Sequence, residues 1–277
     1  MKQARPHVSE RRVCRILAVA RSGVRRRSRW RPVGRGLTKR WPARIADLIR
    51  RHPTFGYRRL WALLRFREGT RLTPKTVYRI CRLRGWFVHQ RATTPRPRVQ
   101  GRRSQAARSN ERWATDVTHV YCGADGWAHL AAVIDCHDRE VIGHEFALRG
   151  RAKEAERALE EACRARFGTL RPPRATPVVR SDNGLIYQSR RFRAACRDYR
   201  LAQEFITPYT PEQNGIIERF FRSLKEECIW QHHFVSFEHA RRELMGWIRW
   251  YNDARPHQAL GYRSPHEFRA HEATQVA

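Results

Sequence analysis

Short runs of apolar residues at helical spacing dominate the first third of the chain. Val13, Ile16 and Leu17 share one face of a helix that we predict over residues 9–20. The same spacing continues over residues 42–65, where the segment His52-Pro53-Thr54-Phe55-Gly56 interrupts it. We therefore expect several short helices in this part of the chain.

A further helix is predicted between Thr73 and Gly85. Thr73 suits the N-cap, Pro74 the first helical position and Gly85 the end of the helix. Its buried face is predicted to consist of Val77, Ile80, Cys81 and Leu83. Its remaining surface is basic, and DNA contacts are predicted for Lys75, Arg79 and Arg82. Short helices that end in a basic helix favour a helix-turn-helix module, and a general basic helical bundle is the alternative.

From Trp113 onward the pattern changes to that of an α/β domain. Alternating or continuous apolar runs predict strands at residues 113–121, 127–135, 140–147, 176–181 and 203–206. Helical spacing predicts helices at residues 152–167 and 189–199, and a long helix from Asn214. Three sequential strands followed by alternating helices and strands predict a mixed five-stranded sheet with flanking helices.

Charge is distributed very unevenly along the 277 residues. Residues 1–110 hold 32 Lys and Arg against three Asp and Glu, so most of the net charge of +31 lies there. Residues 111–277 hold 25 basic and 23 acidic residues and are nearly neutral. A polycationic helical region indicates an anionic partner, and nucleic acid is the commonest one. The alternative, a basic tail that only aids solubility, does not explain its helical pattern.

Cysteine usage and hydropathy narrow the class of protein further. The seven Cys form no CxxC pair, so we expect reduced thiols and no zinc site. No apolar run approaches the length of a membrane helix or of a secretory signal. We therefore predict a soluble, cytoplasmic protein without a membrane partner.

Three acidic residues lie at the edges of predicted elements. Asp116 lies in the first strand, Asp182 ends the fourth strand, and Glu218 lies in the first turns of the long helix. A carboxylate in a buried strand is costly unless it is paired or binds a metal, and two adjacent carboxylates need a cation between them. Mg²⁺ prefers oxygen ligands and leaves coordination positions open for phosphate, so we expect a Mg²⁺ site here.

The long helix has two distinct faces. Glu218, Arg222 and Lys225 share one face. The other face is apolar and consists of Ile217, Phe220, Leu224 and Cys228. An acidic metal ligand beside two phosphate-binding cations would suit this helix, although ordinary Glu–Arg pairing on an amphipathic helix has the same pattern.

Four ordered motifs resemble known proteins that act on DNA. The segment Pro208-Tyr209-Thr210-Pro211-Glu212-Gln213-Asn214-Gly215-Ile216-Ile217-Glu218 is similar to the last catalytic segment of retroviral integrases, and 35 residues separate Asp182 from Glu218, as in D,D(35)E enzymes. Residues 52–60, 181–184 and 251–260 resemble motifs of the OrfB-type transposases of bacterial two-frame insertion sequences. The resemblance covers essentially the whole chain.

This resemblance implies a ribonuclease-H-like integrase core that cleaves insertion-sequence ends and transfers a 3′-hydroxyl into DNA by direct transesterification. Asp116, Asp182 and Glu218 would be the catalytic residues and metal ligands, with Mn²⁺ able to replace Mg²⁺, and Lys225 would contact DNA. The partners would be double-stranded terminal inverted repeats and target DNA, other copies of the chain, and an upstream-frame protein or fusion. The protein would then be associated with the bacterial nucleoid.

The chain departs from the resembling families in two places. The zinc-binding His/Cys segment that begins retroviral integrases is replaced by a basic helical region. After Asp182, the segment Asn183-Gly184-Leu185-Ile186 is more apolar than is common in the OrfB group, which leaves DNA contacts near it open.

We expect five regions along the chain. They are a basic N-terminal helical segment at 1–35, a helix-turn-helix-like domain at 36–89, a basic linker at 90–111, a catalytic core at 112–230, and a C-terminal helical extension at 231–277. Further DNA contacts are predicted for Arg58, Arg59, Gln213 and Asn214. Arg255 and His257 suit either a DNA contact or a brace for the C-terminal segment. Asp135 suits a turn with Asp138 better than a fourth catalytic acid.

Two other functions fit parts of the pattern. A DNA-binding repressor or accessory protein that has lost catalysis would keep the basic front, but it has no need of three correctly spaced acids. A different ribonuclease-H-like nuclease, such as a junction resolvase, would keep the acids but not the helical DNA-binding region. The prediction that joins all the features is a DNA transposase.

Overall fold

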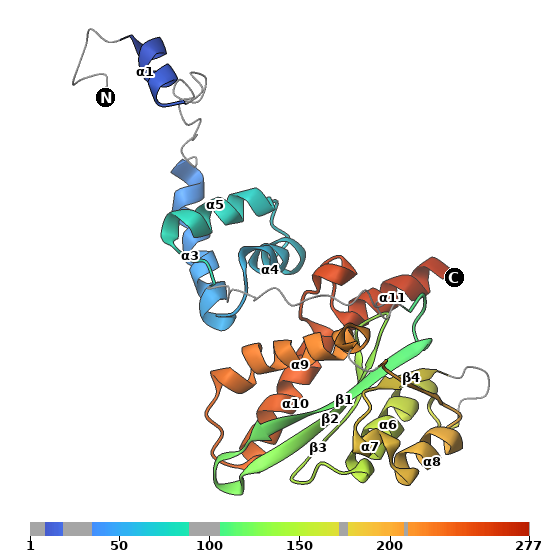
Figure 1. Ribbon diagram of the computed structural model, residues 1–277. Coiled ribbons are helices and arrows are strands. Elements are labelled where there is room, and N and C mark those ends of the chain that lie inside the picture. Colours follow the sequence, from blue (N-terminus) through green and yellow to red (C-terminus); the bar gives the residue numbers. More distant parts are fainter. Residues whose placement is uncertain (1–8, 19–34, 89–105, 172–176, 208–209, 277) are drawn as a thin grey trace. The chain divides into compact units, whose positions relative to one another are not determined.

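The computed structural model describes residues 9–18, 35–88, 106–171, 177–207 and 210–276 (Figure 1). Most of the basic linker predicted at 90–111 lies outside these residues. The chain forms two compact units, residues 1–47 and 48–277, which are described separately. Within the described residues, no helix is both long enough and apolar enough to cross a membrane.

Two of the helices between residues 10 and 84 begin after residues whose side chains cap them, and the later one begins and ends where the sequence predicted. In the first unit, helix α1 (Glu10–Ile16) begins after Ser9, whose hydroxyl accepts a hydrogen bond from the Arg12 amide. Helix α3 (Arg35–Arg51) runs from the first unit into the second. In the second unit follow α4 (Tyr57–Ala62), a π-helical turn η1 (Leu63–Arg67), and α5 (Pro74–Arg84), which Thr73 caps and Gly85 ends with a φ of 68°.

Helix α5 shows one wrong prediction. Val77, Ile80 and Cys81 are buried as expected, but Leu83 is 56% exposed. The buried three follow one another at spacings that keep them on one face, whereas Leu83 comes only two residues after Cys81 and turns away from it. The buried face is therefore narrower than the sequence suggested.

The second unit contains the predicted mixed five-stranded sheet. Its strands are β1 (Arg112–Tyr121), β2 (Trp127–Asp135), β3 (Val141–Ala147), β4 (Val178–Ser181) and β5 (Ala202–Phe205). They lie in the order β3-β2-β1-β4-β5, with β1, β2 and β3 antiparallel and β4 and β5 parallel to β1. This arrangement confirms the mixed five-stranded sheet that the sequence predicted.

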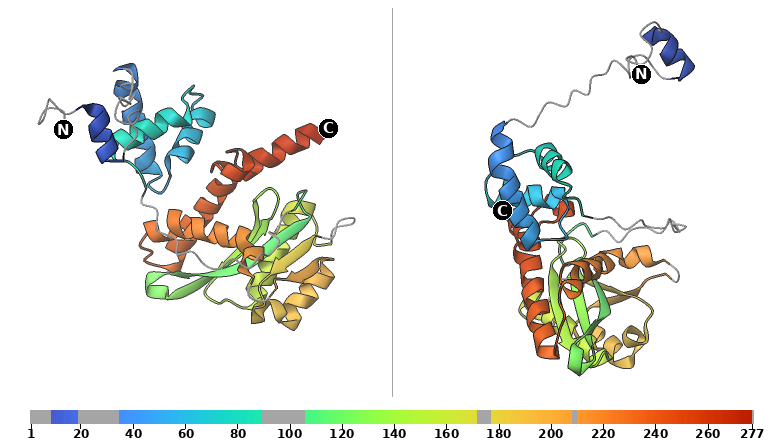
Figure 2. Two further views of the ribbon diagram at one scale, coloured as in Figure 1. Left: turned by 45° about the horizontal axis from the view of Figure 1, so that its top comes forward. Right: turned by 90° about the vertical axis from the view of Figure 1, so that its left-hand side faces the viewer.

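Helices cover both faces of the sheet (Figures 1 and 2). On one face, Leu130 and Ile134 of β2 pack with residues of α9 (Gly215–Glu227) and α10 (Phe237–Asp253). On the other face, Ala131 and Val133 pack with residues of α6 (Ala152–Phe167) and α8 (Arg190–Asp198). Burial on both faces explains why β2 reads as a continuous apolar run.

Helix α6 lies unusually close to β3 because of Gly143. A Cβ atom at Gly143 would lie 2.1 Å from the carbonyl oxygen of Ala158 and 2.7 Å from the amide nitrogen of Ala162. Only glycine permits this close approach, and it allows α6 to pack tightly in the hydrophobic core between the sheet, α6 and α8.

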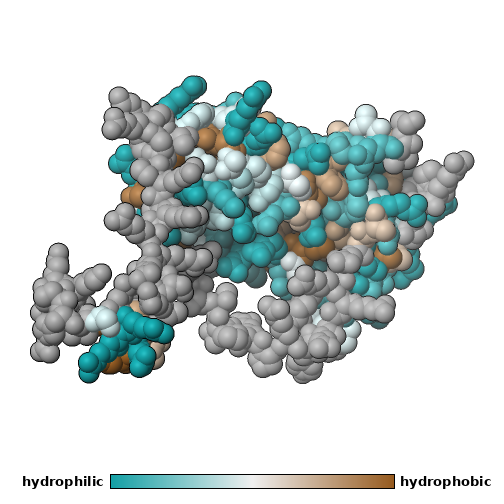
Figure 3. Space-filling view, turned by 90° about the horizontal axis from the view of Figure 1, so that it is seen from above, coloured by the Kyte–Doolittle hydropathy of each residue, from teal (hydrophilic) through white to brown (hydrophobic). Residues whose placement is uncertain are grey.

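One short helix was not predicted from the sequence, and the C-terminal region was predicted only to be helical, without bounds for its helices. Helix α7 (Leu185–Gln188) precedes α8, where a single helix was expected. After α9 come the 3₁₀ turn η4 (Ile229–Gln231), α10, the 3₁₀ turn η5 (Gln258–Leu260) and α11 (Pro265–Val276). The face of the molecule seen in Figure 3 is largely hydrophilic, with smaller hydrophobic patches.

The turn after β2 is built around a buried arginine. The Arg166 side chain is fully buried and donates to both carboxylate oxygens of Asp138, at 3.0 and 2.8 Å. Asp135 accepts hydrogen bonds from the amides of Asn110 and His137. These contacts support the interpretation of Asp135 as a turn residue.

A second buried ion cluster joins the C-terminal segment to α9. Both oxygens of the Glu227 carboxylate accept hydrogen bonds from the Arg255 guanidinium, at 2.6 and 2.7 Å, and Arg59 donates a third at 2.6 Å. The side chains of Glu227 and Arg255 are only 5% and 7% exposed. Arg255 therefore braces the C-terminal segment, which answers the question that the sequence left open.

Replacement of Glu227 by Gln tests how much this cluster stabilises the fold. Burial alone would raise the pKa of the Glu227 carboxyl, but the hydrogen bonds and charges of Arg255 and Arg59 hold it below its ordinary value. The variant leaves the buried Arg255 charge uncompensated, so we expect Glu227→Gln to lower the free energy of unfolding by about 3–5 kcal/mol at pH 7. Denaturant unfolding measures this loss.

The pH dependence of that loss has a defined sign. A lowered carboxyl pKa stabilises the fold above the ordinary pKa of Glu, and this stabilisation disappears as the pH falls through the lowered value. The difference between wild type and Glu227→Gln should therefore shrink in acid. A difference that is small at pH 7, or that grows in acid, would contradict the assignment.

Candidate catalytic site

The pairing of β1 with β4 brings two of the predicted acids together. Ala114 pairs with Arg180 in the parallel register of these strands. The same register continued by two residues sets Asp116 opposite Asp182, just beyond the last residue of β4. Side chains at matching positions of neighbouring parallel strands lie on the same face, so the two carboxylates face one region.

The surroundings of Asp116 disfavour the charged form of its carboxyl group. One of its carboxylate oxygens accepts a hydrogen bond of 2.8 Å from the Val117 amide. Burial, together with the charges of Asp182 and Glu218, raises the pKa of Asp116 to about 6, although the Val117 hydrogen bond and the Lys225 charge oppose the rise. Asp116 therefore interacts electrostatically with both of the other predicted acids, and this repulsion favours a bound cation.

The turn after β4 is shaped around the Asp182 carboxylate. Its Oδ1 accepts a hydrogen bond of 2.9 Å from the Gly184 amide. A Cβ atom at Gly184 would lie 2.8 Å from the same oxygen, so a larger residue would displace the carboxylate. Asn183 donates its side-chain amide to the Ile206 carbonyl at 2.9 Å, which ties this turn to the end of β5.

Helix α9 carries the third acid and its neighbouring cation. Ile217, Phe220 and Leu224 are buried and anchor the helix on the sheet, while Glu218 is exposed in the first turn. Lys225 lies near enough to lower the pKa of Asp116 through its charge. Arg222 is exposed and pairs with Glu226 at 2.8 Å.

The donor set suits a hard divalent cation. Three carboxylates supply oxygen ligands only, which is the chemistry that Mg²⁺ selects. Within the described residues, no three acidic, histidine or cysteine side chains are already gathered closely enough to hold a metal ion. The three carboxylates therefore suit Mg²⁺ in the chemistry of their oxygens, but this structure does not gather them around one point.

Besides Lys225 and Arg222 on α9, seven residues were predicted to contact DNA, and they fall into two groups. Lys75, Arg79, Arg82 and Arg58 are exposed on the helical module, where DNA can reach them. The other three have contacts within the protein. Gln213 accepts from the Thr207 amide at 2.8 Å, Asn214 is 3% exposed, and Arg59 donates to Glu227. A direct DNA contact from Asn214 would require this loop to rearrange.

Two residues that support the site were not singled out as such from the sequence. Tyr187 on α7 is buried with its hydroxyl 3.5 Å from that of Thr115, and burial together with Asp116 and Asp182 raises its pKa well above the ordinary value. A neutral, buried hydroxyl is unsuited to act as a nucleophile. Arg180 donates to Glu204 and to the Gln213 carbonyl, at 2.9 and 3.1 Å. An arginine inside a buried strand was the one signal available for it.

Comparisons with known proteins agree with this architecture. The chain matches family models described as Integrase core domain at residues 106–211 and 199–265, and as HTH-like domain at residues 42–93. Among solved structures, the catalytic core domain of BIV integrase matches with 19% identity and a TM-score of 0.44, over 61% of this chain and 99% of that one.

Curated relatives come from bacterial insertion elements. An uncharacterized 31.7 kDa protein of insertion element IS407 from Burkholderia multivorans is 32% identical, over 97% of this chain and 93% of its own length. Transposase InsD for insertion element IS2A/D/F/H/I/K from Escherichia coli is 32% identical, over 81% of this chain and 76% of its own length. This chain therefore belongs to the insertion-element DNA transposases that are built on an integrase core domain.

Proposed function

We propose that Asp116, Asp182 and Glu218 together hold divalent metal and catalyse both cleavage of insertion-sequence ends and transfer of a 3′-hydroxyl into target DNA by direct transesterification. The observation that carries this proposal is the β1–β4 register, whose continuation sets Asp116 opposite Asp182 in a partly buried site where Glu218 also raises the Asp116 pKa. Bound Mg²⁺, or Mn²⁺ in its place, would activate the attacking oxygen and stabilise the leaving one.

The protein's own residues divide the remaining work. The sheet fixes Asp116 and Asp182, so the ligands need no reorganisation along the strands. Helix α9 supplies Glu218. Lys225 on the same helix offsets the negative charge at Asp116 and binds a phosphate near the cut. Direct transfer of a phosphoryl group between oxygens forms no covalent intermediate with the protein, which agrees with the buried, neutral Tyr187.

The helical module supplies DNA binding in this proposal. The terminal inverted repeats are contacted by Lys75, Arg79 and Arg82 on α5 and by Arg58 on α4. The integrase core binds the target DNA. Joining two ends needs more than one copy, so the chain acts as a homo-oligomer on DNA at the nucleoid. An upstream-frame protein or fusion would add a further DNA-binding segment.

Replacement of the acids tests the chemistry. The assay is strand joining of a pre-cut duplex oligonucleotide that carries the inverted repeat bordering the gene, with Mg²⁺ or Mn²⁺. Because the metal contributes several kcal/mol to the transition state, we expect Asp182→Asn and Glu218→Gln to lower joining by at least about 100-fold while DNA binding persists. Asp198→Asn, on the outer helix α8, is the matched control and should join like wild type.

The outcomes separate the candidate functions. Joining by wild type and the control, but not by the two site variants, supports the three-carboxylate mechanism. Equal joining by all four proteins would contradict it. If wild type binds DNA but is as inert as the variants, the same assay with the upstream frame fused distinguishes a missing partner from a DNA-binding repressor or accessory protein.

Replacement of α5 cations tests the DNA-binding surface. A variant that contacts one phosphate fewer releases fewer counterions from the DNA when it binds. Lys75→Gln and Arg79→Gln should therefore each reduce the slope of log affinity against log salt concentration by about one. The measurement is the dissociation constant of the same duplex over a series of salt concentrations. Unchanged slopes for both variants would place the DNA on another surface.

A further inference from the structure

Two sequence motifs that the catalytic chemistry does not use meet in space. They are the segments 52–60, which includes the start of α4, and 251–260, which begins with the last three residues of α10. The His52 ring stacks on Phe55 and on Trp250 at centroid distances of 4.8 and 5.4 Å, with interplanar angles of 17° and 16°. The Arg59 guanidinium lies 4.6 Å from the centroid of the Phe55 ring. His52 thus contacts the residue just before the second motif, and the two motifs form one joint within the second unit because Arg59 of the first and Arg255 of the second both bind Glu227.

Glu227 lies at the centre of this joint and on the catalytic helix. It is the last residue of α9, nine positions and about two and a half turns beyond Glu218. Arg255 holds it from the C-terminal motif with two hydrogen bonds, and Arg59 holds it from the helical module with one. The Glu227 side chain is 5% exposed, so its position is fixed by these two cations rather than by water.

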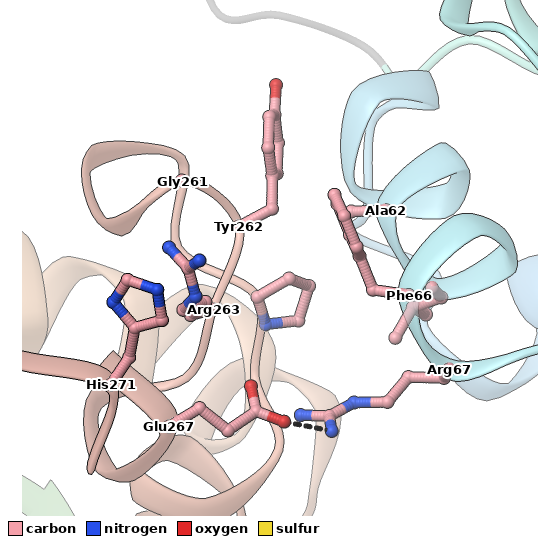
Figure 4. A pocket seen from close by; sticks show the side chains of 10 residues that line it. Ala62, Phe66, Arg67, Gly261, Tyr262, Arg263, Glu267 and His271 are labelled. Atoms are coloured by element: carbon pink, nitrogen blue, oxygen red, sulfur yellow. Dashed lines mark hydrogen bonds and ion pairs between the residues drawn. The ribbon is translucent and has the colours of Figure 1, made fainter. Parts of the chain in front are cut away.

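A second contact joins the same two parts at the π-helical turn. Arg67 forms an ion pair with Glu267 and donates to the Ala254 carbonyl at 3.3 Å. Between the walls that Phe66 and Tyr262 help to form lies a cavity of about 360 Å³ (Figure 4). Both partners of the Arg67 pair are 39% exposed, so solvent screens this contact, and the Glu227 cluster is the firmer of the two.

We propose that Arg59 is a positioning residue, which transmits the placement of the DNA-bound helical module to α9, and thereby to Glu218, through Glu227. This inference rests on the proposed function, because it assumes that α5 binds the DNA end that Glu218 helps to cut. It reassigns Arg59, for which the sequence predicted a DNA contact. Its neighbour Arg58, which is exposed, keeps that role.

The adjacent arginines form a matched pair for an experiment. In Arg58→Gln, the loss of a phosphate contact should weaken DNA binding and reduce the salt slope by about one. In Arg59→Gln, DNA affinity and the salt slope should remain within about twofold of wild type. Strand joining by the bound complex should nevertheless fall by about 10- to 100-fold, because small misplacement of reacting groups is that costly.

Arg59→Lys separates positioning from loss of stability. Arg59 makes a single hydrogen bond to Glu227, which an ammonium can reproduce, so Arg59→Lys should restore joining to within a few fold of wild type. The thermal midpoint of each variant, measured beside the assay, shows that it is folded. Because the Arg59 side chain is 31% exposed, Arg59→Gln is expected to fold.

A hydroxyl-radical footprint on the inverted-repeat duplex tests, without catalysis, whether binding of the helical module places the DNA end at the catalytic site. In wild type, protection should extend from the bases bound by the module to the cleaved end, and in Arg59→Gln only protection at the end should be lost. If wild type protects the end but joins nothing, even with the upstream frame fused, the proposed chemistry fails while the footprints of the two variants still test this inference. Joining and footprints like wild type in Arg59→Gln, or a salt slope reduced as in Arg58→Gln, would overturn it.

Discussion

The parallel pairing of β1 with β4 is the constraint on which the site depends. It places two carboxylates opposite each other in a partly buried region, where burial and neighbouring charge raise the pKa of Asp116 to about 6. A structure that served stability alone would gain from replacing one of these acids by an apolar residue. We therefore propose that this repulsion marks a site prepared for a divalent cation, which would remove it.

Helix α9 connects this site to the rest of the protein. Its apolar face holds it on the sheet, its first turn presents Glu218, and its last residue enters the buried cluster with Arg59 and Arg255. One rigid element thus spans the distance between the chemistry and the helical module. This connection is specific because the two arginines that hold the buried Glu227 carboxylate come from different parts of the chain.

Local signals explain why much of the fold could be predicted. The strand at 127–135 and the helix at 152–167 have the predicted bounds, because apolar runs and helical spacing act over a few residues. Helix α7 was not predicted because four residues give no period. Leu83 was predicted to be buried because it lies three residues after Ile80, but it lies at the edge of that face and is exposed. The bond between Arg59 and Glu227 joins residues 168 positions apart, so no local pattern could reveal it. The three acids were found through their spacing and their resemblance to known enzymes, whereas the support from Gly184 and Tyr187 required the three-dimensional structure.

The central claim is that Asp116, Asp182 and Glu218 share a divalent metal, and diffraction from crystals that contain Mn²⁺ tests it most directly. The account predicts an anomalous peak between Asp116 and Asp182, at about 2.0–2.2 Å from a carboxylate oxygen of each, and no such peak in Asp182→Asn. A peak at another place on the protein, or one between these residues that persists in the variant, would contradict it.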